Sequence, residues 1–205
     1  MTGRGLLAGG AVVAALGAIG LAVHFASAEW RAIQFLAASP EGQVLTLAAG
    51  PVTLPPSIRT GRQTLLACED ALLGDLFEFQ PADARGNITK HCAALAESAR
   101  RRSPQWALAH YLTALTAHTD GNVAIRDAAL LRSQDLAPHE GWLAARRFDL
   151  ARKDLASNAL RATLDADVAV LLDSEAGRAQ LVSAYLADDA LRAGIETAEA
   201  RHETD

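Results

Sequence analysis

The hydrophobic and polar positions of this chain follow two patterns. Between residues 6 and 23 every residue is apolar or glycine, whereas from residue 57 onward apolar residues recur at intervals of three and four. Such intervals place apolar side chains on one face of an α-helix. Alanine, the residue with the highest helix propensity, is abundant throughout the chain. The pattern therefore predicts an all-α protein with closely packed helices.

The first apolar run predicts a transmembrane helix. It extends from Leu6 to Val23, which is near the shortest length that crosses a bilayer as a helix. Arg4 precedes the run, and no charged residue follows it until Glu29. By the positive-inside rule, the amino terminus stays in the cytoplasm and the remainder is exported. We therefore expect residues 1–28 to be a single-pass inner-membrane anchor, with the C-terminal domain in the periplasm.

A cleaved export signal is the alternative for residues 1–28. Ala26, Ser27 and Ala28 form the small-residue pattern that a signal peptidase recognises. Cleavage there would release a soluble periplasmic protein that begins at Glu29. The apolar run is longer than the usual signal core of about 7–15 residues, which favours the anchor. The sequence leaves both alternatives open.

Two cysteines, Cys68 and Cys92, predict one disulfide. Both lie in the part expected to be exported, where an oxidising compartment pairs cysteines. We expect Cys68 on a helix that ends at Gly74 and Cys92 on an antiparallel helix that starts behind Asn87, at similar depth. Such a bridge would stabilise the fold by roughly 3 kcal/mol. Free buried thiols are the alternative, and a His91–Cys92 metal pair is disfavoured because no second ligand pair has zinc spacing.

Proline and glycine divide the exported part into two segments. Residues 29–56 are expected to hold a membrane-proximal helix, interrupted at Ser39 and Pro40, and a Pro/Gly-rich linker. Residues 57–205 are expected to form the periplasmic helical domain.

Capping residues and prolines place the helices of that domain. Ser103 and Pro104 are expected to begin one helix, Asn122 the next, and Pro138 to end that helix and open a third. Asp154, Asp165 or Asp167, and Ser174 are further candidate caps. The expected apolar faces comprise Trp106, Leu108, Tyr111, Leu112, Leu115, Ala124, Ala128, Leu131, Trp142, Ala145 and Phe148.

The spacing of these helices resembles the tetratricopeptide repeat. Pro104 and Pro138 are 34 residues apart, and each precedes a tryptophan. The resemblance implies an array of antiparallel helical hairpins with Trp106, Tyr111, Pro138 and Trp142 in the repeat core. The sequence departs from the repeat in two respects: the tryptophans are 36 residues apart, and His110 or Leu112 replaces the glycine of the first helix.

A narrower resemblance rests on the pattern Ser133, Ala137, Pro138, Glu140, Trp142 and Arg147, together with the anchor-plus-hairpin layout. In these features the chain is similar to small membrane-anchored helical-repeat proteins of proteobacteria that accompany surface-polysaccharide assembly and export machinery. The resemblance implies a place and a partner in the envelope. It implies no catalytic residue.

The candidate catalytic and metal-binding residues favour a structural interpretation. Ser133, Asp135, His139 and Glu140 cluster around Pro138, where caps and first-turn carboxylates of adjoining helices account for them. His110 and His118 share a helix face without a carboxylate between them, which disfavours a metal site. The acidic residues 165–175 lack the glycine of a calcium loop. We expect no catalytic, cofactor or metal site, and a pocket near His139 is the less favoured alternative.

The arginines are the candidate partner-binding residues. Arg101, Arg102, Arg146 and Arg147 could line a groove that binds an acidic peptide or an anionic glycan, or could form a solvated face. Nucleic acid is disfavoured as a partner because the net charge is −5 and no long basic run occurs.

These features together predict a non-enzymatic periplasmic scaffold or adaptor of an envelope complex, serving surface-polysaccharide assembly or export. In the alternative, the protein is a small accessory subunit that contacts an integral membrane complex through its first helix. Gly10, Gly17 and Gly20 would allow close helix packing there.

Overall fold

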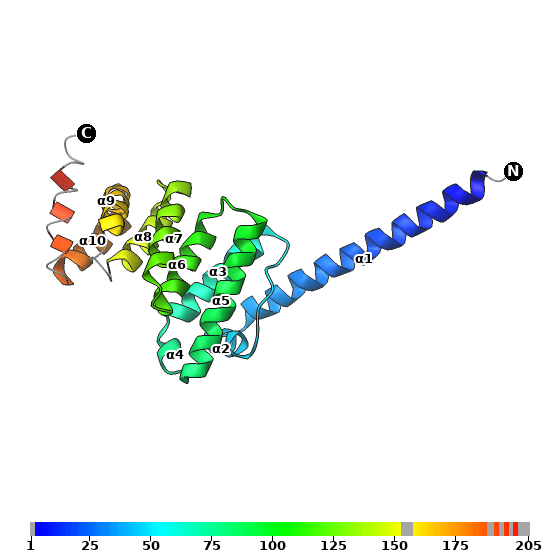
Figure 1. Ribbon diagram of the computed structural model, residues 1–205, viewed down its shortest axis with the longest axis horizontal. Helices are drawn as coiled ribbons and strands as arrows, with labels where there is room; N and C mark the ends of the chain where they lie inside the picture. Colours follow the sequence, from blue (N-terminus) through cyan, green and yellow to red (C-terminus); the bar gives the residue numbers. More distant parts are fainter. Residues whose placement is uncertain (1–2, 153–157, 188–190, 193–194, 197–198, 201–205) are drawn as a thin grey trace. The chain divides into compact units, whose positions relative to one another are not determined.

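The computed structural model describes residues 3–152, 158–187, 191–192, 195–196 and 199–200; the side chains of residues 3–14, 158–160 and 162 lie outside the description. All regular secondary structure in these ranges is helical, which confirms the all-α class (Figure 1). The chain divides into two compact units, Met1–His91 and Cys92–Asp205. This division falls inside a helix, whereas the sequence placed a boundary near residue 57.

The first unit contains four helices and the first half of a fifth. They are α1 (Gly3–Ala37), α2 (Pro40–Ala49), α3 (Ile58–Leu73), α4 (Asp75–Glu78) and α5 (Ala82–Arg102). The second half of α1 packs on α2 and α3, and α2 also packs on α4. Leu47, Leu65 and Ile88 are fully buried in this unit.

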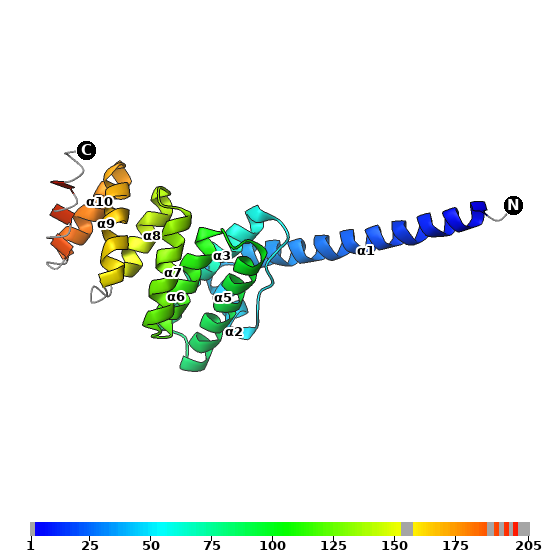
Figure 2. The ribbon, with the colours of Figure 1, turned by 45° about the horizontal axis from the view of Figure 1, so that its top comes forward.

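The first half of α1 projects away from the other helices of its unit in both views (Figures 1 and 2). Residues 15–27 are exposed, and burial begins further along, with Ala32 and Phe35. Over the described residues, no helix is both long enough and apolar enough to span a bilayer. The side chains of residues 6–14, half of the span expected from sequence, lie outside the description.

The predicted breaks in the first unit are largely confirmed. The Ser39 hydroxyl accepts a hydrogen bond from the Gly42 amide at 3.3 Å, and Pro40 occupies the first position of α2. Residues 50–57 are not helical, and α3 ends at Gly74 as expected. These features depend on local chemistry, because a capping hydroxyl and a proline each act within one turn.

The expected start of α5 at Asn87 is wrong. The helix begins at Ala82, directly behind Pro81, and Asn87 lies inside it. The Asn87 side-chain amide donates to the Ala48 carbonyl at 3.3 Å, and His91 Nδ1 lies 2.7 Å from the Leu47 carbonyl oxygen. Asn87 therefore makes a tertiary hydrogen bond to the end of α2 and does not cap α5.

The predicted disulfide is confirmed. Cys68 on α3 and Cys92 on α5 are both disulfide-bonded, and both are fully buried.

The second unit is built from helical hairpins. Beyond the end of α5 it contains α6 (Ala107–Thr119), α7 (Val123–Leu136), α8 (Gly141–Ala151), α9 (Asn158–Leu172) and α10 (Glu175–Ala187). The pairs α6–α7 and α8–α9 pack side by side, and α7 packs on α9 as α6 packs on α8 (Figure 2). Two successive hairpins are therefore stacked, and α10 covers α8 and α9.

The starts of α6 and α8 differ from the expected positions. Helix α6 begins at Ala107, because residues 104–105 form a turn in which the Trp106 amide donates to the Ser103 carbonyl. Helix α8 begins at Gly141, so His139 and Glu140 precede the helix and do not form its first turn. Pro138 lies in the joint between α7 and α8, as expected.

The turn before α7 is as predicted, but the buried face of α7 is not. Gly121 has φ 71°, and the Asn122 side chain accepts from the Ile125 amide at 3.2 Å. The buried residues of α7 are Arg126, Ala129, Leu130 and Ser133, whereas the expected Ala124 and Ala128 are exposed.

Of the remaining expected caps and core residues, some are confirmed and others are wrong. Ser174 caps α10 by accepting from the Gly177 amide at 3.0 Å. Asp165 and Asp167 lie in the interior of α9 and therefore cap nothing, and Asp154 lies outside the described residues. Trp106 and Trp142 are only partly buried, whereas Tyr111 and Phe148 are buried completely or nearly so.

Candidate functional site

Arg147 is not a surface residue, which corrects one of the sequence expectations. Its side chain is 0% exposed and pairs with Asp167, which is also 0% exposed. Arg147 Nε lies 3.1 and 3.0 Å from the two carboxylate oxygens of Asp167, and a terminal nitrogen donates to the Ala137 carbonyl at 3.3 Å. Arg147 therefore joins α8, α9 and the end of α7 inside the unit and is unavailable to a partner.

The environment of this pair affects the protonation of Asp167. Burial raises the pKa of the Asp167 carboxyl to about 6, and the Arg147 guanidinium opposes that rise through hydrogen bonds and charge. The carboxylate is thus stabilised by its partner and destabilised by its surroundings. An ion pair held in this way is a structural connection between helices.

Arg146 does not act together with its neighbour. Its guanidinium lies over the Trp142 ring, 5.3 Å from the ring centre, and donates to the Trp142 carbonyl at 3.2 Å. The adjacent arginines 146 and 147 are thus directed to different places, because neighbouring positions on a helix lie about 100° apart. The paired cationic surface expected from the sequence does not form.

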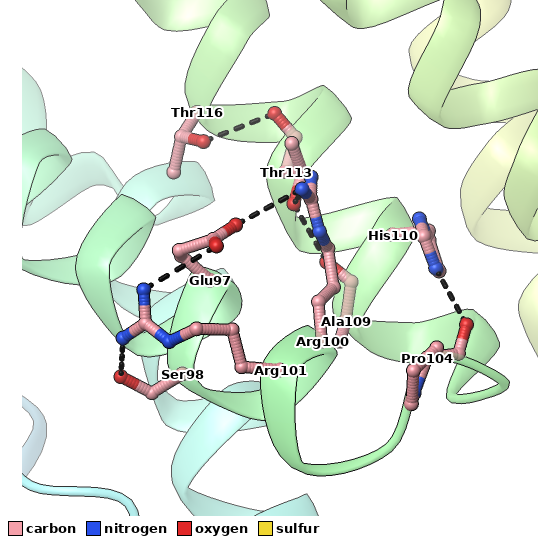
Figure 3. Close-up of polar contacts among 9 residues, drawn as sticks. All are labelled: Glu97, Ser98, Arg100, Arg101, Pro104, Ala109, His110, Thr113 and Thr116. Carbon is pink, nitrogen blue, oxygen red and sulfur yellow. Dashed lines mark hydrogen bonds and ion pairs between the residues drawn. The ribbon is translucent and has the colours of Figure 1, made fainter.

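The arginines at the end of α5 also separate (Figure 3). Arg101, 66% exposed, contacts Glu97 and Ser98, each at 3.3 Å, and Arg102 is exposed. Arg100 pairs with Glu97 of its own helix at 2.9 Å, and it also extends toward α6, where it donates to the Thr113 hydroxyl at 3.4 Å. Arg100 therefore differs from its neighbours in reaching the next helix.

A groove of about 370 Å³ lies where Arg100 meets α6 and α7. Arg100, His110, Thr113 and Arg132 form its polar lining, and Ala124, Ile125, Ala128 and Ala129 form its apolar lining. All of these residues belong to the second unit. We call this feature the α5–α7 groove.

His110 occupies the α6 side of the groove and is fixed by the preceding loop. Its Nε2 lies 3.0 Å from the Pro104 carbonyl oxygen, so Nε2 carries the proton that this bond requires (Figure 3). Burial lowers the pKa of His110, the Pro104 carbonyl raises it, and the Arg100 and Arg132 guanidinium groups lower it further. The two arginines thus create a positive potential at His110 from two different helices.

Sequence reasoning missed Arg132 as a member of this site. On α7, Ile125 lies three and four residues before Ala128 and Ala129, and Arg132 lies four and three residues after them, so these side chains line the groove together. That spacing is the signal in the sequence that points to Arg132. The expected apolar face of Ala124, Ala128 and Leu131 shares only Ala124 and Ala128 with the groove and does not include Arg132.

The other candidate chemical residues do not gather into a site. His139 is exposed in the joint between α7 and α8. Among the residues that the structure describes, no three His, Cys, Asp or Glu side chains gather where they could hold a metal ion.

Comparison of the chain with protein-family models, curated proteins and solved structures found no match. The tetratricopeptide-like and polysaccharide-assembly resemblances therefore stay predictions.

Proposed function

We propose that this protein is a non-enzymatic adaptor of a bacterial envelope complex. In this proposal the first helix holds the chain in the inner membrane, and the helical units face the periplasm. The observation that carries the proposal is the stack of two helical hairpins, α6–α7 and α8–α9, with the arginine-lined α5–α7 groove on its surface. Stacked hairpins of this kind provide extended binding surfaces in repeat proteins.

The membrane anchor is supported by the apolar run of residues 6–23 and by the exposure of residues 15–27 on α1. Nothing in the first unit covers these described side chains, as expected for a segment whose surroundings are lipid. Trp30 is 61% exposed just beyond the run, and tryptophan is enriched where membrane-spanning helices leave the bilayer.

The periplasmic location is supported by the Cys68–Cys92 disulfide, since disulfides persist in oxidising compartments. The role in surface-polysaccharide assembly or export rests on the sequence resemblance alone. The periplasmic location and this role are both parts of the proposal.

A second candidate function is that of an accessory subunit whose first helix contacts an integral membrane complex. One observation favours it: a Cβ built on Gly17 or Gly20 would meet no atom within 4 Å, so both positions are open to an approaching helix. Small residues on transmembrane helices allow the helix backbones to approach closely.

The test of localisation uses alkaline phosphatase fused behind residue 205, because this enzyme is active only after export. We expect activity in cells and retention of the fusion in the membrane fraction after carbonate washing. Mass spectrometry of the mature amino terminus then separates anchor from signal, since a chain beginning at Glu29 would contradict the anchor. An inactive fusion would contradict export altogether.

The two candidate functions are separated by replacing residues 1–28 with a cleavable export signal. An adaptor that needs only a tether should retain partner binding when exported as a soluble protein. A subunit that binds through its first helix should lose partner binding after this replacement. The matched control replaces residues 1–28 with an unrelated single-pass anchor.

A further inference from the structure

The α5–α7 groove carries positive charge that the described chain does not neutralise. Arg100 is paired with Glu97 at 2.9 Å, but no hydrogen bond or ion pair to another described residue engages the Arg132 side chain. Arg132 is exposed, and its charge reaches His110 across the groove. An unpaired guanidinium, with the Arg100 guanidinium lining the same groove, favours an anionic ligand.

The lining between the charged groups is apolar. Ala124, Ala128 and Ala129 lie along the α7 wall, and Ile125 is 50% exposed beside them. Small side chains leave room for another chain to approach the helix, and the exposed Ile125 offers apolar contact area. The occupant should therefore combine carboxylates with small or aliphatic side chains.

These features favour a peptide over a glycan. Sugar rings are commonly bound against the faces of tryptophan, tyrosine or phenylalanine, and none of these residue types lines the groove among the described residues. A volume of about 370 Å³ admits a few side chains and not a folded surface. Arginine clusters combined with apolar contacts are a recurring means of recognising acidic peptide motifs.

We propose that the α5–α7 groove binds an acidic peptide segment of a partner protein. One ligand carboxylate pairs with Arg132, and a second takes the place of Glu97 as the ion-pair partner of Arg100. An aliphatic side chain between the two carboxylates packs against Ile125. This inference rests on the adaptor function proposed above and names the chemistry of its partner.

The test measures binding to the full-length protein in an uncharged detergent by isothermal titration calorimetry. The probe is the synthetic peptide acetyl-Ala-Glu-Leu-Ala-Glu-Ala-amide, and its matched control carries glutamine in place of both glutamates. We expect the glutamate peptide to bind and the glutamine peptide to bind at least about tenfold more weakly. Equal affinity for the two peptides would overturn the proposal.

A variant pair locates the binding site. Arg132→Glu should weaken binding at least about tenfold, because it places a carboxylate opposite the ligand's own. Arg59→Glu makes the same charge change at an exposed position of α3 in the first unit and should leave affinity unchanged. Circular dichroism checks that both variants fold. Binding that survives Arg132→Glu in a folded protein would remove the groove from the proposal.

Two further probes cover other occupants. An oligomer of galacturonic acid that binds more tightly than the peptide, and loses affinity in Arg132→Glu, would identify a glycan site and overturn the proposal. The second probe is a synthetic peptide of residues 196–205, which is itself rich in glutamate. If it bound more tightly than the test peptide, the occupant would be a second copy of this chain, and the proposal would be overturned. Failure of peptide binding in a protein that is exported and membrane-retained would remove only this inference, because the localisation test does not involve the groove.

Discussion

Arg147 and Asp167 form an ion pair that is closed to solvent, with Arg147 Nε 3.1 and 3.0 Å from the two carboxylate oxygens of Asp167. The pair connects α8 to α9, and the Ala137 carbonyl extends the connection to the end of α7. Three consecutive helices of the second unit are thus joined at one buried guanidinium.

Replacing Asp167 with leucine should strongly destabilise the protein. Arg147 would remain buried without its carboxylate, and removal of one partner from a buried pair costs roughly 3–5 kcal/mol. Asp167→Asn should be milder, because the amide oxygen still accepts a hydrogen bond and the burial cost of the carboxylate is removed. Urea denaturation followed by circular dichroism measures both. Equal losses for the two variants would contradict the importance of the acceptor.

The double variant Arg147→Met with Asp167→Leu is the matched control for this prediction. It removes both charges and fills the space with apolar atoms, which in buried pairs is often neutral or stabilising. We expect its free energy of unfolding to be far closer to that of the wild type than that of Asp167→Leu alone. If the double variant is as unstable as the single one, shape and not charge determines the effect.

Asp167 should also make stability depend on pH. Its pKa rises from 3.8 to about 6 on folding, so between these values the folded state holds a proton that the unfolded state releases. The stabilising contribution of this group is therefore complete below about pH 4 and is lost as pH rises through about 6. We expect the wild type, compared with the double variant, to lose stability over this interval. If the free energy of unfolding varied with pH in the same way for the wild type and the double variant, the raised pKa of Asp167 would be contradicted.

Local features of the fold could be predicted from sequence because each depends on a few neighbouring residues. Ser39 before Pro40, Gly74 after a helix, and Asn122 after a glycine each have an intrinsic conformational preference or a capping side chain. Such preferences act within one turn, so tertiary packing rarely reverses them. The disulfide was predictable because the chain contains only two cysteines.

The candidate site could not be predicted in the same way, because it is assembled from three helices. Alanine is so frequent that more than one face of α7 has an apolar pattern, and the true buried face includes Arg126 and Ser133. The burial of Arg147 depends on Asp167, twenty residues further along the chain. Only the packing of α9 against α8 brings this carboxylate to its partner, and sequence periodicity does not contain that information.

Removing the disulfide should lower stability by roughly 3 kcal/mol in the chain-entropy model. The variant Cys68→Ser with Cys92→Ser is compared with the wild type by thermal unfolding, with and without reductant. Reductant should lower the melting temperature of the wild type and leave the variant unchanged. If reductant also lowered the melting temperature of the variant, its effect on the wild type could not be attributed to the disulfide.

Glu29 should hold α1 to the start of α3. Its carboxylate accepts from the Ser57 hydroxyl at 2.7 Å, from the Ser57 amide at 3.3 Å and from the Thr60 hydroxyl. The hydrogen bonds from Thr60 and then Ser57 lower the pKa of Glu29 below 4.5. Because the folded pKa is lowered, this contribution is present above the unfolded value and is lost as pH falls through the folded value.

Glu29→Ala should therefore accelerate amide hydrogen exchange at residues 57–61, since the start of α3 loses its acceptor and the α1 contact loosens. Glu29→Gln should have a smaller effect because its amide oxygen still accepts. Glu41→Ala, which removes the same charge in the first turn of α2, is the matched control and should leave exchange at residues 57–61 unchanged. If Glu29→Ala leaves these amides as protected as in the wild type, α1 is held to α3 by its apolar face at Ala32 and Phe35 alone.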